Sequence, residues 1–301
     1  MGAGHPRNRL RGMGFVDRHA KWLFPLPAMV FIFVMMIFPL IYTLYNSFTG
    51  WSLSSGAPRT WNHFANYARL VHDDRFLLSI VRMFYFTVAA VAVELIIGTA
   101  VAVFLNRSFR GKNIIQALLL LPMMATPVAV AMVWMLMFEP TAGIVNYLLS
   151  IVGLPQPGWL GEARWALPTL ILLDVWEWSP MITLMALAGL TNLSSETLEA
   201  AAVDGATPWQ TFWRITLPLL RPTLTVAVLL RVIDALKWFD TIYATTGGGP
   251  GYATETLNIY TYQQAFSYFN FGYVSSILVV FFAIVLGISL LLSVIRGRVE
   301  A

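Results

Sequence analysis

The sequence predicts an all-α, polytopic membrane protein with six transmembrane helices and a small helical unit on the cytoplasmic side. Three features of the composition support this prediction. Of the 301 residues, 58% are hydrophobic, only 11% are charged, and none is Cys. An average soluble domain is about one quarter charged, so the composition argues against a soluble enzyme and a disordered chain. The absence of Cys excludes disulfide scaffolds, thiolate zinc sites and Cys nucleophiles.

The long charge-poor stretches predict where the chain crosses the membrane. About 20 apolar helical residues are needed to cross the hydrocarbon core. The predicted spans are residues 22–48, 80–105, 114–138, 166–190, 219–245 and 272–295. The first is longer than the hydrophobic region of a signal peptide, so we expect it to be retained. Because it contains Pro25, Pro27 and Pro39, we expect neighbouring helices to cover its kinks in a bundle.

The positions of the basic residues predict the orientation. If the N-terminus is cytoplasmic, the cytoplasmic segments hold Arg7, Arg9, Arg11, Arg18, Lys21, Arg107, Arg110, Lys112, Arg214, Arg221, Arg296 and Arg298. The external segments hold only Arg59, Arg69, Arg75, Arg82 and Arg164. Positive residues favour the cytoplasmic side, so both termini are expected inside. Residues 1–21 then form a basic tail, 22–295 the transmembrane domain and 296–301 a second tail. The net charge of +4 is explained by the basic residues that set this orientation, so no nucleic-acid partner is expected.

The connection between the fourth and fifth spans, residues 191–221, predicts two short helices. Ser194 can cap the first helix, and Gly205 can end it in a left-handed conformation. Thr207 and Pro208 read as the start of the second, a cap followed by Pro at the first helical position. The aromatic residues that follow share one face. We therefore expect a helical hairpin beneath the membrane.

This connection resembles the EAA loop of ABC importer permeases. The matching positions are Glu199-Ala200-Ala201, Gly205 and Ile215-Thr216-Leu217-Pro218. A second segment resembles the carbohydrate-import branch, which includes the maltose and glycerol-3-phosphate transporter permeases. It runs from Phe239 to Tyr243 and on through Thr246 to Pro250. An alternative interpretation is a lipid-facing re-entrant or plain connecting loop, but polar helix ends cannot stay unpaired in hydrocarbon.

The resemblance implies a permease subunit of an ATP-driven importer in the bacterial inner membrane. In that family, two permeases, often different, form the pathway, an ABC ATPase dimer grips the EAA loops, and an extracytoplasmic binding protein delivers the solute. The residues implied in coupling to the ATPase are Glu199, Ala200, Ala201, Asp204, Gly205, Ile215, Leu217 and Pro218. The chain lacks the GxxxxGK[ST] phosphate-binding pattern. We therefore expect ATP and Mg²⁺ to bind the separate ATPase, and this chain to hold no cofactor and perform no covalent chemistry.

Apart from Arg82 and Arg221, which lie at span ends, seven charged residues fall inside the predicted spans, where ionisable groups are costly and usually functional. They are Glu94, Asp174, Glu177, Arg231, Asp234, Lys237 and Asp240. Helical spacing places three residues on one face of the fourth span and three on one face of the fifth. These six are the predicted substrate-binding residues: Asp174, Glu177, Trp178, Arg231, Asp234 and Trp238. Charged groups and aromatic rings together suit a sugar, and the resemblance places the maltose-type site at or near matching positions, although with amides and small residues there.

Structural pairing is an equally supported role for Arg231 and Asp234, because buried charges usually pair. Lys237 and Asp240 are expected to be structural or gating residues, with a second ion pair between them as the structural form. Glu94 is expected to have a partner on another helix. Two other functions stay open. A proton-coupled carrier would use Asp174, Glu177 and Asp234 as a relay, and a membrane enzyme would use Asp174 and Asp234 as a carboxylate pair. The four His show no metal-ligand spacing, so no metal is expected. The sequence leaves the solute, and whether it is anionic, undecided.

Overall fold

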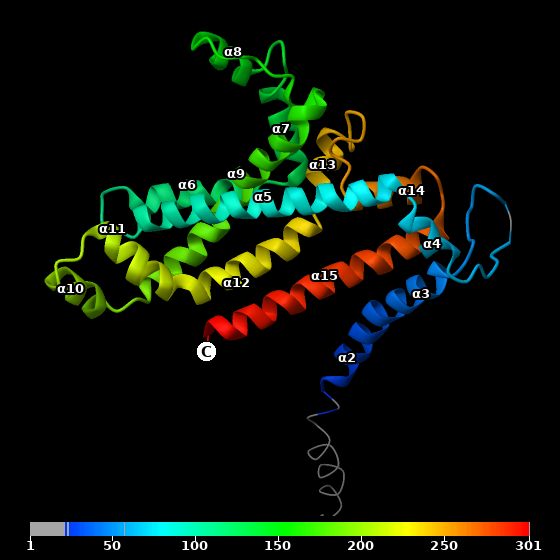
Figure 1. Cartoon of the computed structure of the whole chain (residues 1–301), viewed down its shortest axis with the longest axis horizontal. Coiled ribbons are helices and arrows are strands. Elements are labelled where there is room, and N and C mark those ends of the chain that lie inside the picture. Colours follow the sequence, from blue (N-terminus) through cyan, green and yellow to red (C-terminus); the bar gives the residue numbers. More distant parts are fainter. Residues whose placement is uncertain (1–21, 23, 57, 301) are drawn as a thin grey trace, which may run out of the picture. The chain divides into compact units, whose positions relative to one another are not determined.

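A computed structural model describes residues 22, 24–56 and 58–300 (Figure 1). Within these residues all regular secondary structure is helical, apart from one isolated antiparallel bridge between Thr49 and Trp61. The prediction of an all-α fold is confirmed. The predicted N-terminal tail, residues 1–21, lies outside the described residues, and so does the last residue of the C-terminal tail. The chain forms two units: the described part of residues 1–68 with 269–279, and residues 69–268 with 280–300.

The first unit begins with one continuous helical run made of α2 (Leu26–Ile32), η1 (Phe33–Ile37) and α3 (Phe38–Ser47). The η1 segment is a π-helix directly before Pro39. Pro lacks a backbone N–H and collides with the carbonyl four residues earlier, and a wider π-turn relieves that collision. Asn66, on α4 (Ala65–Val71), donates hydrogen bonds to the carbonyls of Ser47 and Thr49 at 2.8 and 2.9 Å, which satisfies the end of α3.

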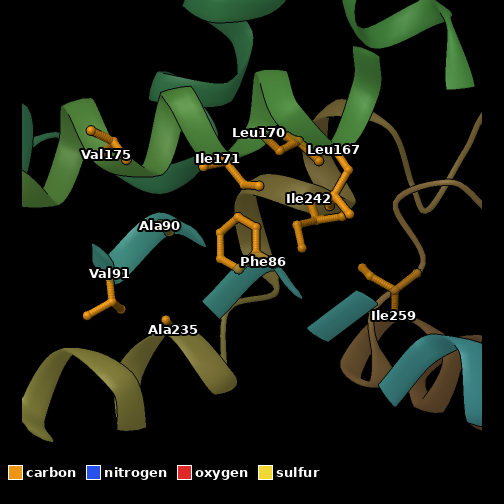
Figure 2. Packing of buried hydrophobic residues seen from close by; sticks show 10 residues of the cluster. All are labelled: Phe86, Ala90, Val91, Leu167, Leu170, Ile171, Val175, Ala235, Ile242 and Ile259. Carbon is orange, nitrogen blue, oxygen red and sulfur yellow. The ribbon is translucent and has the colours of Figure 1, made fainter. Parts of the chain in front are cut away.

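The second unit is built on three helices that pack on one another (Figure 1). They are α5 (Asp74–Leu105), α9 (Ala163–Thr191) and α12 (Leu217–Leu236). Figure 2 shows their shared core around Phe86, with Leu170 and Ile171 from α9 and Ala235 from α12. Two short helices close this core, α13 (Asp240–Thr245) through Ile242 and α14 (Leu257–Phe266) through Ile259. A second apolar cluster joins the same three helices towards the other end of α5.

The third predicted span, 114–138, is not a straight helix. It forms α6 (Lys112–Met124) and α7 (Pro127–Met137), which are bent by 99° at a short break. Ala125 and Thr126 are extended, with ψ of 148° and 140°. For Thr126 the reason is Pro127, because a residue before Pro is pushed out of the helical region. Two short elements, α8 (Ile144–Ile151) and η2 (Trp159–Gly161), then lead into α9.

The prediction of a continuous fifth span over 219–245 is wrong. The helix α12 ends at Leu236, and the chain restarts as α13 at Asp240. The reason is an interaction far along the chain: the side-chain amide of Asn258 donates to the carbonyl of Leu236 at 3.0 Å and to that of Trp238 at 3.5 Å. These bonds satisfy carbonyls that a continuing helix would have used.

Six uninterrupted spans are therefore not observed in the described part of the chain. Four helical runs are long and apolar enough to cross a membrane: Leu26–Ser47, Asp74–Leu105, Ala163–Thr191 and Phe271–Arg298. The bent pair of α6 and α7 could supply a fifth. The helix α12 has 20 residues, about 30 Å at 1.5 Å per residue. It matches the bilayer in length, but it carries Arg221, Arg231 and Asp234.

The predicted hairpin between the fourth and fifth spans is present. The first helix is α10 (Ser195–Val203), and the second is α11 (Pro208–Thr211), which continues through the π-helix η3 (Phe212–Thr216) into α12. Gly205 has φ of +78°, the left-handed conformation expected for it. Thr207 and Gln210 form a reciprocal capping box at the start of α11. The last helix of the chain is α15 (Phe271–Glu300).

Candidate functional site

The centre of the candidate site is the guanidinium of Arg231, which is wholly buried. Its Nε donates to Glu94 Oε2 at 2.8 Å, and its Nη2 donates to Glu94 Oε1 at 3.1 Å. The same Nη2 donates to Asp174 Oδ2. Glu94 and Asp174 are also wholly buried. Because Arg231 lies on α12, Glu94 on α5 and Asp174 on α9, one side chain ties the three central helices together. The expected interhelical partner of Glu94 is confirmed.

Asp234 and Lys237 continue the network towards the exposed side. Arg231 Nη1 donates to Asp234 Oδ2 at 3.4 Å, the longest of the four hydrogen bonds that the guanidinium makes. Lys237 Nζ lies 3.8 Å from Asp234 Oδ1, so its partner is Asp234, and the prediction that it pairs with Asp240 is wrong. The side chains of Asp234 and Lys237 are 47% and 54% exposed. The network therefore runs from the buried side chains of Glu94, Asp174 and Arg231 to the half-exposed side chains of Asp234 and Lys237.

Glu177 and Trp178 complete the cluster from α9. The guanidinium carbon of Arg231 lies 5.0 Å from the centre of the Trp178 ring, which is within cation–π range. Glu177 is buried and close enough to interact electrostatically with Arg231, Asp174 and Asp234. Three buried polar atoms here have no hydrogen-bond partner among the described residues: Asp174 Oδ1, Glu177 Oε2 and Trp178 Nε1. Buried polar atoms are nearly always paired, so these three atoms are open to a hydrogen bond with a group outside the described residues.

Trp238 is the predicted site residue that the structure places differently. The prediction put it on the same helical face as Arg231 and Asp234, but α12 ends two residues earlier. Its ring stacks on Phe86, with centroids 4.5 Å apart and planes 12° apart. Trp238 thus packs on the apolar core around Phe86, the core that Figure 2 shows. The structure brings together the other five predicted residues and adds Glu94.

Sequence reasoning missed a second ion pair, between Arg75 and Glu255. Arg75 Nε and Nη2 donate to Glu255 Oε2 and Oε1 at 2.7 and 2.5 Å, and Nη2 also donates to Gln263. The Glu255 side chain has no exposed surface. The guanidinium carbon lies 3.9 Å from the centre of the Tyr252 ring. These contacts fasten the loop between α13 and α14 to the start of α5. The two residues lie 180 apart in sequence, and no local pattern relates them.

The predicted coupling residues lie on and around the hairpin of α10 and α11. Glu199, Ala200, Asp204 and Gly205 are exposed, whereas Ala201 is buried against its own chain. Large apolar side chains are also exposed on the hairpin: Val203 (87%), Trp209 (70%) and Trp213 (50%). The remaining coupling residues, Ile215, Leu217 and Pro218, are partly buried where η3 runs into α12. The hairpin thus presents a polar helix and an adjoining aromatic surface.

Residues 94–300 match the family described as the binding-protein-dependent transport system inner membrane component. The chain belongs to this family. The matched region begins at Glu94 and contains the charged cluster, the hairpin and the loop after α13. The permease is therefore a membrane protein, in agreement with its apolar helices.

Two relatives and one solved structure show how far the similarity extends. The permease is 36% identical to the trehalose/maltose transport system permease protein MalF of Thermococcus litoralis over 257 residues, which covers 85% of each chain. It is 34% identical to the sulfoquinovosyl glycerol transport system permease protein SmoG of Agrobacterium fabrum, over 91% of this chain and 89% of that one. A crystal structure of a bacterial ABC transporter involved in the import of the acidic polysaccharide alginate has the same fold. That similarity has a TM-score of 0.82 at 21% identity and covers 97% of this chain and 100% of the other.

Proposed function

We propose that this permease forms, with a second permease, the translocation pathway of an ATP-driven importer for a sugar or sugar-like solute. The observation that carries the proposal is the similarity to a trehalose/maltose permease over 85% of both chains. A solute-binding protein delivers the solute from outside, as the family description implies. The permease itself performs no covalent chemistry.

The hairpin of α10 and α11 couples the permease to an ATPase dimer, which binds ATP and Mg²⁺. Support comes from the exposure of Glu199, Ala200 and Asp204 beside the aromatic surface of Trp209 and Trp213. A partner protein would bury that aromatic surface. In this proposal Glu199 pairs with a basic group of the ATPase, and Gly205 holds the turn between the two helices.

The hairpin and both termini lie on the cytoplasmic side of a bacterial plasma membrane. The bias of Lys and Arg towards the segments on that side supports this orientation. The exposed polar ends of α10 and α11 support it too, because such ends need water or a protein partner.

The solute passes the charged cluster between α9 and α12. Asp234 and Trp178 are its accessible members. Asp174 and Glu177 supply acceptor oxygens that the protein leaves unpaired. Arg231 holds the Asp174 carboxylate in position through a hydrogen bond to Oδ2.

The test is reconstitution of this chain with its second permease, ATPase and binding protein in liposomes. The proposal expects sugar uptake that requires ATP inside the liposomes and binding protein outside. Uptake that continues without the ATPase and stops when a protonophore collapses the proton gradient would instead identify a proton-coupled carrier.

A further inference from the structure

The charged cluster contains one buried cation and an excess of carboxylates. Glu94, Asp174 and Glu177 are each at most 3% exposed, and Arg231 is the buried guanidinium that faces them. Asp234 adds a fourth carboxylate at the exposed edge, where Lys237 lies 3.8 Å away. A solute that reaches this edge meets Asp234 and Lys237, and the three buried carboxylates lie behind them.

The positive charge of Arg231 is not available to a solute. Its guanidinium has five N–H groups, and it makes four hydrogen bonds, all to carboxylates on three helices. The Trp178 ring lies over it at 5.0 Å. An anionic sugar would have to break these bonds, and it would leave buried carboxylates without a partner. Removing one partner of a buried ion pair is strongly unfavourable.

The unpaired atoms of the cluster suit a neutral or cationic solute. Asp174 Oδ1 and Glu177 Oε2 are buried acceptors, and Trp178 Nε1 is a donor. Sugar hydroxyls both donate and accept hydrogen bonds, and an ammonium group only donates. A carboxylate, sulfonate or phosphate only accepts and adds a negative charge, which repels the acidic groups at short range. A carboxyl of the cluster that takes up a proton becomes a hydroxyl donor, and the cluster still offers no free cation.

We propose that the cluster of Glu94, Asp174, Glu177, Arg231 and Asp234 selects neutral or amino sugars and rejects anionic ones. This inference rests on the proposed function, since it assigns a substrate class to the same site. The fold alone does not determine the charge of the solute, because a transporter with the same fold is involved in the import of the acidic polysaccharide alginate. The decisive feature is that four of the five N–H groups of Arg231 already bind carboxylates of its own chain.

The test measures solute binding to the purified complex of both permeases and the ATPase, without the binding protein, so that the binding protein's own preference does not contribute. The probes are methyl glucoside, methyl glucosaminide and methyl glucuronide, which share a pyranose ring and differ in charge. The expected result is a rise in Tm with the first two and a much smaller rise with the glucuronide. An equal or larger rise with the glucuronide would overturn the inference. If no probe changes the Tm, the cluster is not a sugar site and the inference also fails, whereas uptake by the complete transporter tests the proposed function separately.

A variant that is expected to bind the glucuronide more tightly provides a second test, because misfolding does not explain a gain of binding. The double substitution E177Q and D234N removes two negative charges but keeps Arg231 bound to Glu94 and Asp174. The ratio of the glucuronide Kd to the glucoside Kd should fall roughly tenfold, which equals about 1.4 kcal/mol. The control E162Q removes one exposed carboxylate before α9, outside the cluster, and should leave the ratio unchanged. An unchanged ratio in the double variant would contradict the proposal.

Discussion

Arg231 and Glu94 form a doubly hydrogen-bonded ion pair that has no exposed surface, although the two residues lie 137 positions apart in sequence. A buried pair of this kind gains little over an apolar contact when it is intact, because both charges lose their hydration. It is costly to break from one side, because the remaining charge stays buried. The pair therefore acts mainly to fix how α5 and α12 meet.

Replacing Arg231 with Met should destabilise the permease by about 3–5 kcal/mol, because the substitution leaves Glu94 and Asp174 buried without their cation. The measurement is thermal unfolding of the purified permease complex, followed by tryptophan fluorescence. Adding E94Q to R231M should recover part of the loss, since it removes one of the unpaired charges.

The control for this prediction is K237M, six residues beyond Arg231 and directly after the end of α12. Lys237 is 54% exposed and contacts only Asp234 among the acidic groups of the described residues. Its loss should change the unfolding free energy by less than about 0.5 kcal/mol. If R231M and K237M have similar midpoints of thermal unfolding, Arg231 does not hold the three helices together.

The Arg75–Glu255 pair predicts a separate effect in the loop between α13 and α14. The substitution E255Q removes the charge that holds Arg75, and the loop should open locally. Hydrogen exchange of residues 246–256 should become several times faster, while exchange in the middle of α9 should not change. R164Q serves as the control, because Arg164 is an exposed outer residue far from this loop in the chain. Equal exchange in E255Q and the unaltered protein would show that the loop needs no such anchor.

The sequence predicted the parts of this structure that depend on near neighbours. The hairpin follows from Gly205, Thr207 and Pro208, whose effects on the backbone reach only a few residues. The bend before Pro127 has a local signal as well, which the apolar composition of residues 114–138 obscured. The charge-based argument also located five members of the cluster, because ionisable groups stand out in an apolar helix.

The features that the sequence did not predict depend on distant partners. The end of α12 is set by Asn258, which lies 22 residues beyond Leu236 in the chain. The predicted contact between Arg231 and Asp234 is present, but two further partners of Arg231 lie 137 and 57 positions away. Helical spacing offered Asp234 as a partner because it was the nearest acid, yet that contact is the longest. Tertiary packing decided each case, and a single sequence does not contain that information in readable form.

Gly205 offers a test of coupling that leaves the membrane part intact. Its φ of +78° is strained for a β-branched residue but accessible to Asn. The substitution G205V should therefore disturb the turn between α10 and α11 and abolish solute-stimulated ATPase activity in the reconstituted transporter. G205N should retain most of the activity. Both proteins should insert in the membrane in equal amounts, as measured by immunoblot of the membrane fraction. Full activity in G205V would exclude this turn from coupling.

Two glycines of α15 form a matched pair for a test of the first unit. A Cβ on Gly272 would lie 2.0 Å from the Thr49 carbonyl oxygen, whereas a Cβ on Gly287 would meet no atom within 4 Å. The Gly272 N–H also donates to the Trp51 carbonyl at 2.8 Å. G272A should therefore force the backbone of residues 49–51 away and lower the thermal midpoint. G287A should leave the midpoint unchanged or raise it, since Ala favours a helix by up to about 1 kcal/mol.

Hydrogen exchange distinguishes this local effect from a general loss of stability. In G272A, exchange should accelerate in residues 48–53, where Gly50 N–H donates to Thr60 and Leu53 N–H donates to Phe269. Exchange in the core of α5 and α9 should stay as it is, because those helices belong to the other unit. A midpoint in G272A equal to that in G287A would mean that the close approach of Gly272 to Thr49 does not constrain this end of the chain.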